Sequence, residues 1–336
     1  MRSKFYTRSF LVLAVILLVS SFYYLPYYVS KPGMAKELEP IIEVENGNDE
    51  QGSFMLTTVR MGRANIYAYV AAKFSKYQEL YPEEEIRSEN ETEEEYNVRQ
   101  LHLMATSKVA AIETAYKKAG IPIHYHYNGV YVLNVLPDMP AHGKLQAGDR
   151  IFKVGGKEFK SSDEFISMVS NKQEGSEITL TFERQDKTKE TSIPLKTLKE
   201  TGKPGVGITL VDDKEIEVEP AVNIDSKEIG GPSAGLMFSL EIYNQLIKED
   251  LTGGYKIAGT GTINSEGTVG RIGGIEQKIV AADKAGAEIF LAPNEKGAED
   301  SNYVAAVATA RDIKTDMKII PVDTFDDAVE YLRNLD

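Results

Sequence analysis

EIGGPSAG (residues 228–235) runs directly into LMFSLEIYNQLIKE (residues 236–249), and this junction is the most informative part of the sequence. The apolar residues after Gly235 recur at helical spacing, so we expect Ser233 at the start of a helix, immediately after a glycine turn. Free backbone N–H groups and the positive end of the helix dipole would then face an oxyanion beside Ser233. The placement suits the nucleophile of an acyl-transfer reaction, and a plain helix N-cap is the alternative.

The same residues match G-x-S-x-G, the nucleophile turn of α/β-hydrolases, which requires a histidine after the serine. That order is impossible because all four histidines precede Ser233: His102, His124, His126 and His142. A histidine base in another order is conceivable, but three of the four fall in a segment of short strands, where packing explains them. No G-x-x-x-x-G-K-[ST] sequence occurs in the chain, so we expect no ATP site. Ser233 therefore needs a base of another kind.

Lysine can be that base when burial disfavours its charged form and lowers its pKa. Lys278 is the candidate, in GTGTINSEGTVGRIGGIEQKIVAADKAGA (residues 259–287). It lies one turn into a predicted helix that follows the Gly273-Gly274 turn, among apolar neighbours. Taken alone, Lys278 also fits a solvated helix lysine.

Taken together, GPSAG and, 45 residues after the serine, IGGIEQK followed by AA and AG resemble the proteolytic domain of Lon (S16) peptidases. The resemblance implies a Ser–Lys dyad in which Ser233 is the nucleophile and Lys278 the general base. The supporting threonine of the family falls on Thr260, in the TG pair 18 residues before the lysine. The resemblance implies neither a cofactor nor a metal. The chain departs from many Lon enzymes at Gly230, where they carry an acid.

Residues 123–200 change to short alternating strands, and GVYVLNVLPDMPAHGKLQAGDRIFKVGGKEF (residues 129–159) resembles a bacterial PDZ domain. A PDZ domain implies capture of a peptide by strand addition. The glycine-hydrophobic loop that holds a free carboxylate is not obvious before Val130. His124 and His126 fall on one strand face, but they have no third ligand at suitable spacing, so we expect no metal site.

The segments on either side of the PDZ domain resemble two parts of one Lon proteolytic domain, residues 53–122 and 201–336. Phe54–Val59 looks like its opening strand, helical spacing follows at 64–80 and 96–119, and VEPAVNID (residues 218–225) looks like a further strand. The expected fold is an α/β (α+β) Lon proteolytic domain with an inserted, mainly β PDZ domain, preceded by one N-terminal transmembrane helix.

That helix is expected at residues 9–30, which are free of charge and long enough, at about 33 Å, to cross the hydrocarbon layer. The positive-inside rule places the basic residues 1–8 in the cytoplasm and everything after the helix outside. Residues 31–52, rich in Pro, Gly, Asn and acids, read as a linker. A cleaved signal peptide with Leu11–Val19 as its apolar core is the alternative.

The composition limits the partners. The 336 residues include no Cys, which excludes disulfides and thiolate metal sites, and carry a net charge of −13, which argues against nucleic-acid binding. Anchor, PDZ and Lon-like domain together resemble the membrane-anchored PDZ-Lon proteases of Gram-positive bacteria, the SepM/YlbL type. The resemblance implies an ATP-independent, extracellular serine endopeptidase for limited proteolysis of exported peptides or small proteins, including signalling peptides. A non-catalytic PDZ docking protein at the outer face of the cell membrane is the alternative.

Overall fold

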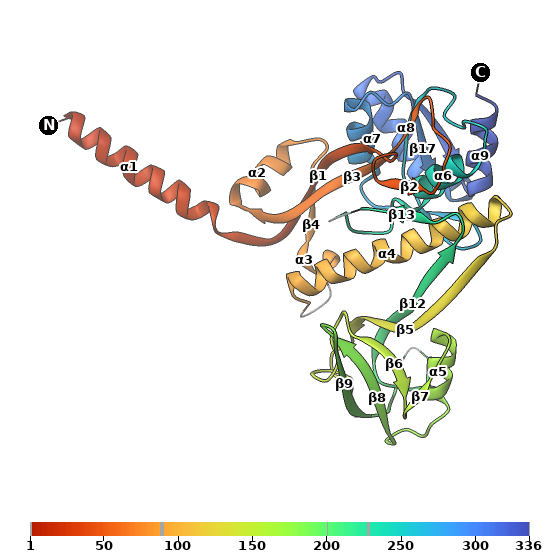
Figure 1. Cartoon of the computed structure of the whole chain (residues 1–336). Helices are drawn as coiled ribbons and strands as arrows, with labels where there is room; N and C mark the ends of the chain where they lie inside the picture. Colours follow the sequence, from red (N-terminus) through yellow and green to blue (C-terminus); the bar gives the residue numbers. More distant parts are fainter. Residues whose placement is uncertain (1, 88–90, 200, 227–228, 336) are drawn as a thin grey trace.

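The computed structural model describes residues 2–87, 91–199, 201–226 and 229–335, so residues 1, 88–90, 200, 227, 228 and 336 of the segments discussed above lie outside it. Figure 1 shows three parts: an α/β unit that contains the C-terminus, a mainly β unit, and an N-terminal arm that projects from the α/β unit.

A six-stranded mixed sheet forms the centre of the α/β unit. Four neighbouring strands run parallel, and at one edge a fifth strand pairs antiparallel with both the fourth and the sixth. In spatial order they are β18 (Lys318–Val322), β17 (Ile289–Pro293), β14 (Lys256–Gly259), β3 (Ser53–Asn65), β1 (Tyr24–Glu37) and β4 (Glu79–Pro82). The predicted strand at Phe54–Val59 is confirmed within β3. β3 pairs with β14, so chain segments from before and after the β unit share one sheet.

Helices cover both faces of this sheet. Phe54 and Leu56 belong to one core with helices α4 (Glu93–Lys118), α6 (Gly235–Leu246) and α9 (Phe325–Arg333). Met55 points to the other core, with α7 (Ile275–Lys284) and α8 (Asn302–Ile313). Alternate residues of one strand thus feed two cores, as a strand covered on both faces requires. The helical predictions at 96–119, after Gly235 and around Lys278 are confirmed.

Shorter elements complete the α/β unit. Two short antiparallel pairs lie beside the helices, and the region around 64–80 contains a helix of only nine residues. These elements are β2 (Ile42–Val44) with β13 (Val222–Ile224), β15 (Thr262–Ile263) with β16 (Val269–Gly270), α2 (Ile66–Phe74), α3 (Glu83–Ile86) and a 3₁₀ turn at Glu295–Gly297. β13 lies within the strand predicted at residues 218–225.

The β unit is a separate sheet with its own core and one helix. Its strand order is β12 (Ile208–Val218), β5 (Ile123–Val135), β6 (Arg150–Val154), β8 (Glu177–Arg184) and β9 (Lys187–Pro194). The smaller elements are α5 (Ser162–Ser170), β7 (Lys157–Glu158) beside β6, and the pair β10 (Lys196–Thr197) and β11 (Pro204–Gly205). β5 and β12 pair along their whole length, so the unit extends past the predicted end at residue 200 to Val218.

The N-terminal predictions at 9–30 and 31–52 are wrong in their bounds. Helix α1 covers Arg2–Ser21, and the residues from Tyr24 to Glu37 form β1, which pairs with β3 and β4. Aromatic and β-branched residues in YLPYYVS favour an extended chain, and β1 buries Tyr28 and Val29. Within the described part of the chain, no helix combines the length and apolar character that a membrane span requires.

Candidate active site

Ser233 lies in a tight turn at the start of α6, as the sequence predicts. Gly231 has φ 85°, and its N–H donates to the carbonyl of Gln100 in α4 at 2.9 Å. The Ser107 hydroxyl donates to the Pro232 carbonyl at 3.1 Å. At Gly235 an added Cβ would lie 2.8 Å from Ile263 Cγ2, so only glycine lets α6 approach this closely. The glycines therefore fix the position of the serine between α4 and β15.

Lys278 reaches this turn from the first turn of α7. The helix begins after Gly274, which has φ 70°. Lys278 is only 2% exposed. Its Nζ lies 2.8 Å from Ser233 Oγ, 2.9 Å from Thr260 Oγ1 and 3.1 Å from the Thr57 carbonyl oxygen. The structure thus brings the three residues that the sequence singled out into one hydrogen-bonded group.

The hydrogen bonds of this group have one consistent direction. The Thr260 hydroxyl lies 2.9 Å from the Ser233 carbonyl and donates its only proton there, so it accepts from Nζ. The Thr57 carbonyl can only accept, and it takes the second N–H of a neutral amine. The lone pair of Nζ then remains for the Ser233 hydroxyl. Backbone and Thr260 together aim the basic electron pair at Ser233 Oγ.

Burial makes the amine a base near neutral pH. Removal of Lys278 from water disfavours its ammonium form and lowers its pKa from 10.5 to about 7. A substantial fraction of Lys278 is therefore uncharged at neutral pH and able to accept the serine proton.

The N-terminus of α6 supplies the electrostatic complement. α6 begins at Gly235 with Ala234 as its N-cap, and its first N–H groups have no acceptor within the helix. Those of Gly235 and Leu236 donate to the carbonyls of Pro232 at 3.4 Å and Gly261 at 3.1 Å, so what the helix offers at Ser233 is the positive end of its dipole. This positive end adjoins Ser233, where an oxyanion would form after attack on a carbonyl.

Three contributors to the site were missed from sequence: the Thr57 carbonyl, and Gln100 and Ser107 in α4. A main-chain carbonyl has no residue signature, and the two α4 residues look like ordinary helix surface. The strand pattern at 54–59 was the only available signal for Thr57, which also donates from its hydroxyl to the Gly259 carbonyl at 3.0 Å.

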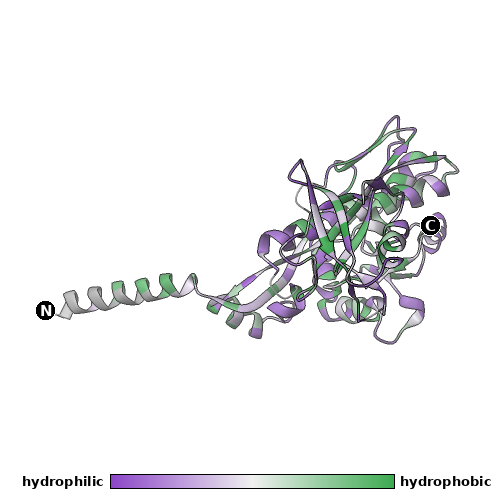
Figure 2. Cartoon of the chain, turned by 90° about the horizontal axis from the view of Figure 1, so that it is seen from below, coloured by the Kyte–Doolittle hydropathy of each residue, from purple (hydrophilic) through white to green (hydrophobic). Residues whose placement is uncertain are grey.

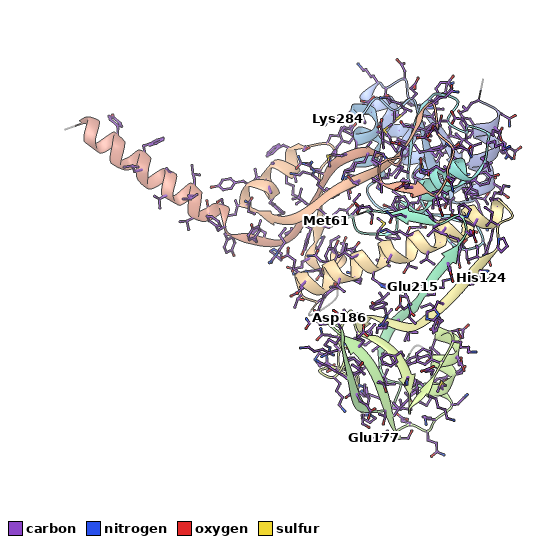
Figure 3. All side chains as sticks on the ribbon, viewed as in Figure 1. Met61, His124, Glu177, Asp186, Glu215 and Lys284 are labelled. Carbon is purple, nitrogen blue, oxygen red and sulfur yellow. The ribbon has the colours of Figure 1, made fainter. Side chains whose placement is uncertain are left out.

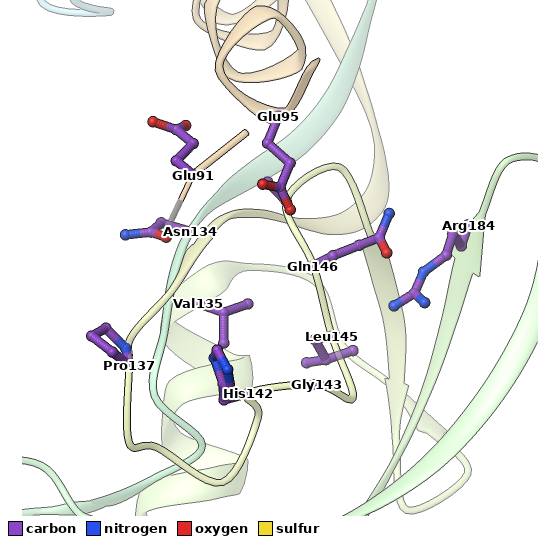
Figure 4. Close-up of a pocket in the computed structure, with 11 residues that line it drawn as sticks. Glu91, Glu95, Asn134, Val135, Pro137, His142, Gly143, Leu145, Gln146 and Arg184 are labelled. Carbon is purple, nitrogen blue, oxygen red and sulfur yellow. The ribbon is translucent and has the colours of Figure 1, made fainter. Parts of the chain in front are cut away.

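The histidines belong to other surroundings. The His102 ring lies 4.4 Å from that of Tyr131, and burial lowers its pKa to about 4. His124 and His126 lie on β5. His142 lines a cavity of about 270 Å³ between the β unit and the start of α4 (Figure 4). Among the described residues, no group of three His, Cys, Asp or Glu side chains is arranged to hold a metal ion.

The β unit offers an edge for strand addition. β12 is the edge strand next to α5, and the Ser162 N–H at the start of α5 donates to Asp212 Oδ1 of β12 at 2.7 Å. Gly205-Val206-Gly207-Ile208 leads into β12 and has the glycine-hydrophobic character that is not obvious before Val130. The segment escapes a reading of the sequence because it follows the other strands of the sheet in the chain.

An α/β unit with a buried Ser–Lys pair, joined to a unit with an open strand edge, defines a serine peptidase with a peptide-binding module. The family models agree: a PDZ domain matches residues 118–195, and the Lon protease (S16) C-terminal proteolytic domain matches residues 170–334. The chain therefore carries a PDZ domain and a Lon-type (S16) proteolytic domain, which is a serine peptidase domain.

Similar proteins cover parts of the chain. The Lon protease of Campylobacter jejuni is 31% identical over 188 residues, which are 53% of this chain and 22% of that protein. The Lon protease of Campylobacter concisus is 39% identical over 100 residues, 30% of this chain and 12% of that protein. The chain thus spans about a fifth or less of these relatives. The solved PDZ domain of an SdrC-like protein from Listeria monocytogenes is 42% identical, covering 26% of this chain and 90% of that one, with a TM-score of 0.25.

Proposed function

We propose that the chain is an ATP-independent, membrane-anchored serine endopeptidase that performs limited proteolysis of exported peptides or small proteins. Ser233 Oγ attacks the scissile carbonyl carbon while its proton passes to Lys278 Nζ. The oxyanion that forms is stabilised at the N-terminus of α6. Lys278 then gives the proton to the leaving amine, and an acyl-enzyme on Ser233 remains.

Hydrolysis repeats these steps with water. Lys278 takes a proton from a water molecule, whose oxygen attacks the acyl carbon, and returns the proton to Ser233 Oγ as the ester bond breaks. Thr260 and the Thr57 carbonyl hold Nζ throughout. The observation that carries this mechanism is the geometry at Lys278 Nζ. Its two N–H groups are held by Thr260 and the Thr57 carbonyl, so its lone pair faces Ser233 Oγ at 2.8 Å.

The test is cleavage of a mixture of secreted peptides, read by mass spectrometry, with Ser233→Ala and Lys278→Ala variants. Each variant should lose cleavage while remaining folded, and the double variant should be no worse than either, because the two residues act as one unit. Lys284→Ala, at the exposed end of α7, is the matched control and should stay active. Ordinary turnover by a folded Ser233→Ala or Lys278→Ala variant would reject the mechanism, whereas no cleavage by the unsubstituted chain would favour a docking protein.

Substrate capture is assigned to the PDZ domain. The edge of β12 beside α5 allows a peptide to add as a strand, with main-chain hydrogen bonds supplying affinity and side-chain pockets supplying selectivity. Such binding raises the concentration of a long substrate near Ser233 without altering the chemical step.

Membrane anchoring and an extracellular catalytic domain complete the proposal. Support comes from α1, which projects from the folded units (Figure 2), from the basic residues at its start, and from the uncharged residues 9–21 that follow within the helix. Phe10 and Leu18 in this part of α1 are exposed. ATP independence is supported by the absence of a P-loop sequence.

A further inference from the structure

The part of the N-terminal arm that carries helix α2 is rich in basic residues, unlike the rest of the molecule. We define the α2 arm as residues 24–36 of β1 and residues 58–78, which contain the end of β3 and α2. These residues include six basic side chains and no acid, in a chain whose net charge is −13; Glu37 and Glu79 adjoin their ends, and Glu79 of β4 lies opposite Ser30 of β1. The basic residues are Lys31, Lys36, Arg60, Arg63, Lys73 and Lys76. Arg63 and Lys76 pair with acids outside the arm, Glu83 and Asp312.

Helix α2 exposes an apolar stripe. Ile66, Val70 and Phe74 are spaced four residues apart, which places them along one side of the helix, and they are 38%, 50% and 88% exposed. The other side packs through Ala72 against Val29 of β1 and Ala64 of β3. Ala68, Tyr69 and Ala72 thus face the protein, while the stripe of Ile66, Val70 and Phe74 faces outward, unlike a helix whose only contact is its own domain.

The stripe adjoins the end of α1. Tyr67 Oη donates to the Leu17 carbonyl at 3.0 Å, and Asn65 Nδ2 donates to the Ser21 carbonyl at 3.0 Å. These bonds hold α2 beside the end of the helix to which we assign membrane anchoring. Figure 3 shows the arm, with Met61 labelled on it, between α1 and the folded units.

We propose that the α2 arm docks on the membrane surface, with Ile66, Val70 and Phe74 in the interface and its basic residues against anionic lipid headgroups. The proposal rests on the membrane anchoring proposed above. A large apolar face flanked by Lys and Arg is the pattern of an interfacial helix, and anionic lipids attract such basic segments. Docking would hold the Ser–Lys site and the PDZ domain at a set height above the bilayer.

The chain contains no Trp, so a single substitution supplies a site-specific probe. Phe74→Trp in the full chain is reconstituted in phosphatidylcholine/phosphatidylglycerol vesicles, with or without brominated acyl chains. Tyr125→Trp is the matched control, because Tyr125 is a half-exposed aromatic residue on β5, away from the arm. Flotation on a density gradient shows whether each variant is bound to the vesicles.

We expect both variants to float, and only the Phe74→Trp variant to emit at shorter wavelength and be quenched by brominated lipid. Adding Lys73→Glu and Arg60→Glu to that variant, or using vesicles of phosphatidylcholine alone, should reduce the quenching.

Three outcomes would overturn the proposal. Flotation of the Phe74→Trp variant with an indole as solvent-exposed as that of the Tyr125→Trp control overturns the docking of α2 and leaves anchoring intact. Failure to float overturns both anchoring and docking. An emission shift in the Phe74→Trp variant that depends on protein density, without quenching by bromine, means that a second copy covers the stripe in place of lipid.

Discussion

At Thr260 a single hydroxyl determines how the amine of Lys278 is used. The hydroxyl donates a hydrogen bond to the Ser233 carbonyl and accepts a hydrogen bond from Nζ. It therefore both ties the serine turn to the end of β14 and directs the lone pair of Nζ. Thr260 acts through its hydroxyl oxygen, which positions Nζ, and not through the packing of its methyl group.

Thr260→Val keeps the shape and removes the oxygen. An N–H of Nζ then loses its acceptor in a buried site, while the Ser233 carbonyl keeps the Gly261 N–H at 3.0 Å. The lost partner costs about 1–3 kcal/mol, so we expect kcat to fall roughly 10- to 100-fold with little change in KM. Thr260→Ser restores the hydroxyl and should recover most of the activity. A Val variant as active as the Ser variant would show that the hydroxyl does not position Nζ.

Glu241 is a buried acid that the site does not use. It is fully buried in α6, and Gln245 donates to one carboxylate oxygen, while the other oxygen has no hydrogen-bond partner among the described residues. Its pKa is raised from 4.5 to about 8 by burial and then by the charge of Glu50. A raised folded-state pKa means that the stability it contributes is complete below pH 4.5 and is lost as the pH rises through about 8.

Glu241→Gln replaces the carboxyl group by an amide of the same shape, which cannot ionise. We expect the free energy of unfolding of the variant to exceed that of the wild type by roughly 1–3 kcal/mol at pH 8.5, and the difference to shrink toward pH 5. Urea unfolding at the two pH values measures it. Glu43→Gln, an exposed acid lining the same cavity of about 650 Å³, is the control and should change little. An equal effect at both pH values would contradict the assignment.

At the scale of elements, the close approach of α6 to α4 and β15 determines where the nucleophile stands. An added Cβ at Gly235 meets Ile263 Cγ2 at 2.8 Å and Ser107 Oγ at 2.9 Å, so Gly235→Ala must displace the start of α6. We expect the free energy of unfolding to fall by about 1–3 kcal/mol. We expect kcat to fall by a larger fraction of its value than the free energy of unfolding does. Gly273→Ala, before α7, has open space around the new Cβ and should be tolerated. Unchanged kcat in Gly235→Ala would separate the helix contact from catalysis.

Both chain connections between the PDZ domain and the protease run through the β5–β12 ribbon. Ile123 and Val218 are register partners at its base, so a short Gly-Ser link can replace residues 124–217 without stretching the protease. Because the PDZ acts on substrate concentration, the folded deletion variant should cleave a short peptide normally and a long substrate with raised KM. Equal loss on both substrates would mean that the PDZ completes the catalytic site.

For the molecule as a whole, the sequence revealed chemistry better than boundaries. Ser233, Lys278 and Thr260 could be singled out because GPSAG, the TG pair and IGGIEQK resemble the motifs of the Lon (S16) proteolytic domain, and the fold brings these three residues into one hydrogen-bonded group. The bounds of the N-terminal segments could not, because an uncharged run fits both an apolar helix and an aromatic strand. Only the pairing of Tyr24–Glu37 with β3 decides between them.

Long-range pairing also hid the PDZ edge and the amine's third partner. β12 follows β9 in the chain but lies beside β5 in the sheet. The glycine-hydrophobic segment that precedes β12 is therefore far along the sequence from Val130, where such a loop would be sought. The Thr57 carbonyl enters the site because β3 runs parallel to β14, a pairing between strands about 200 residues apart.

The central claim is that the neutral amine of Lys278 activates Ser233, and the pH dependence of Ser233 acylation tests it most directly. A fluorophosphonate, or a peptide ester under single turnover, is followed by mass spectrometry of the adduct on Ser233. The pKa of Lys278 is lowered to about 7, so the rate should rise with pH through an apparent pKa near 7 and level off above it. Lys278→Met should abolish the rise. A rate that climbs only near pH 10, or an unchanged profile in Lys278→Met, would contradict the account.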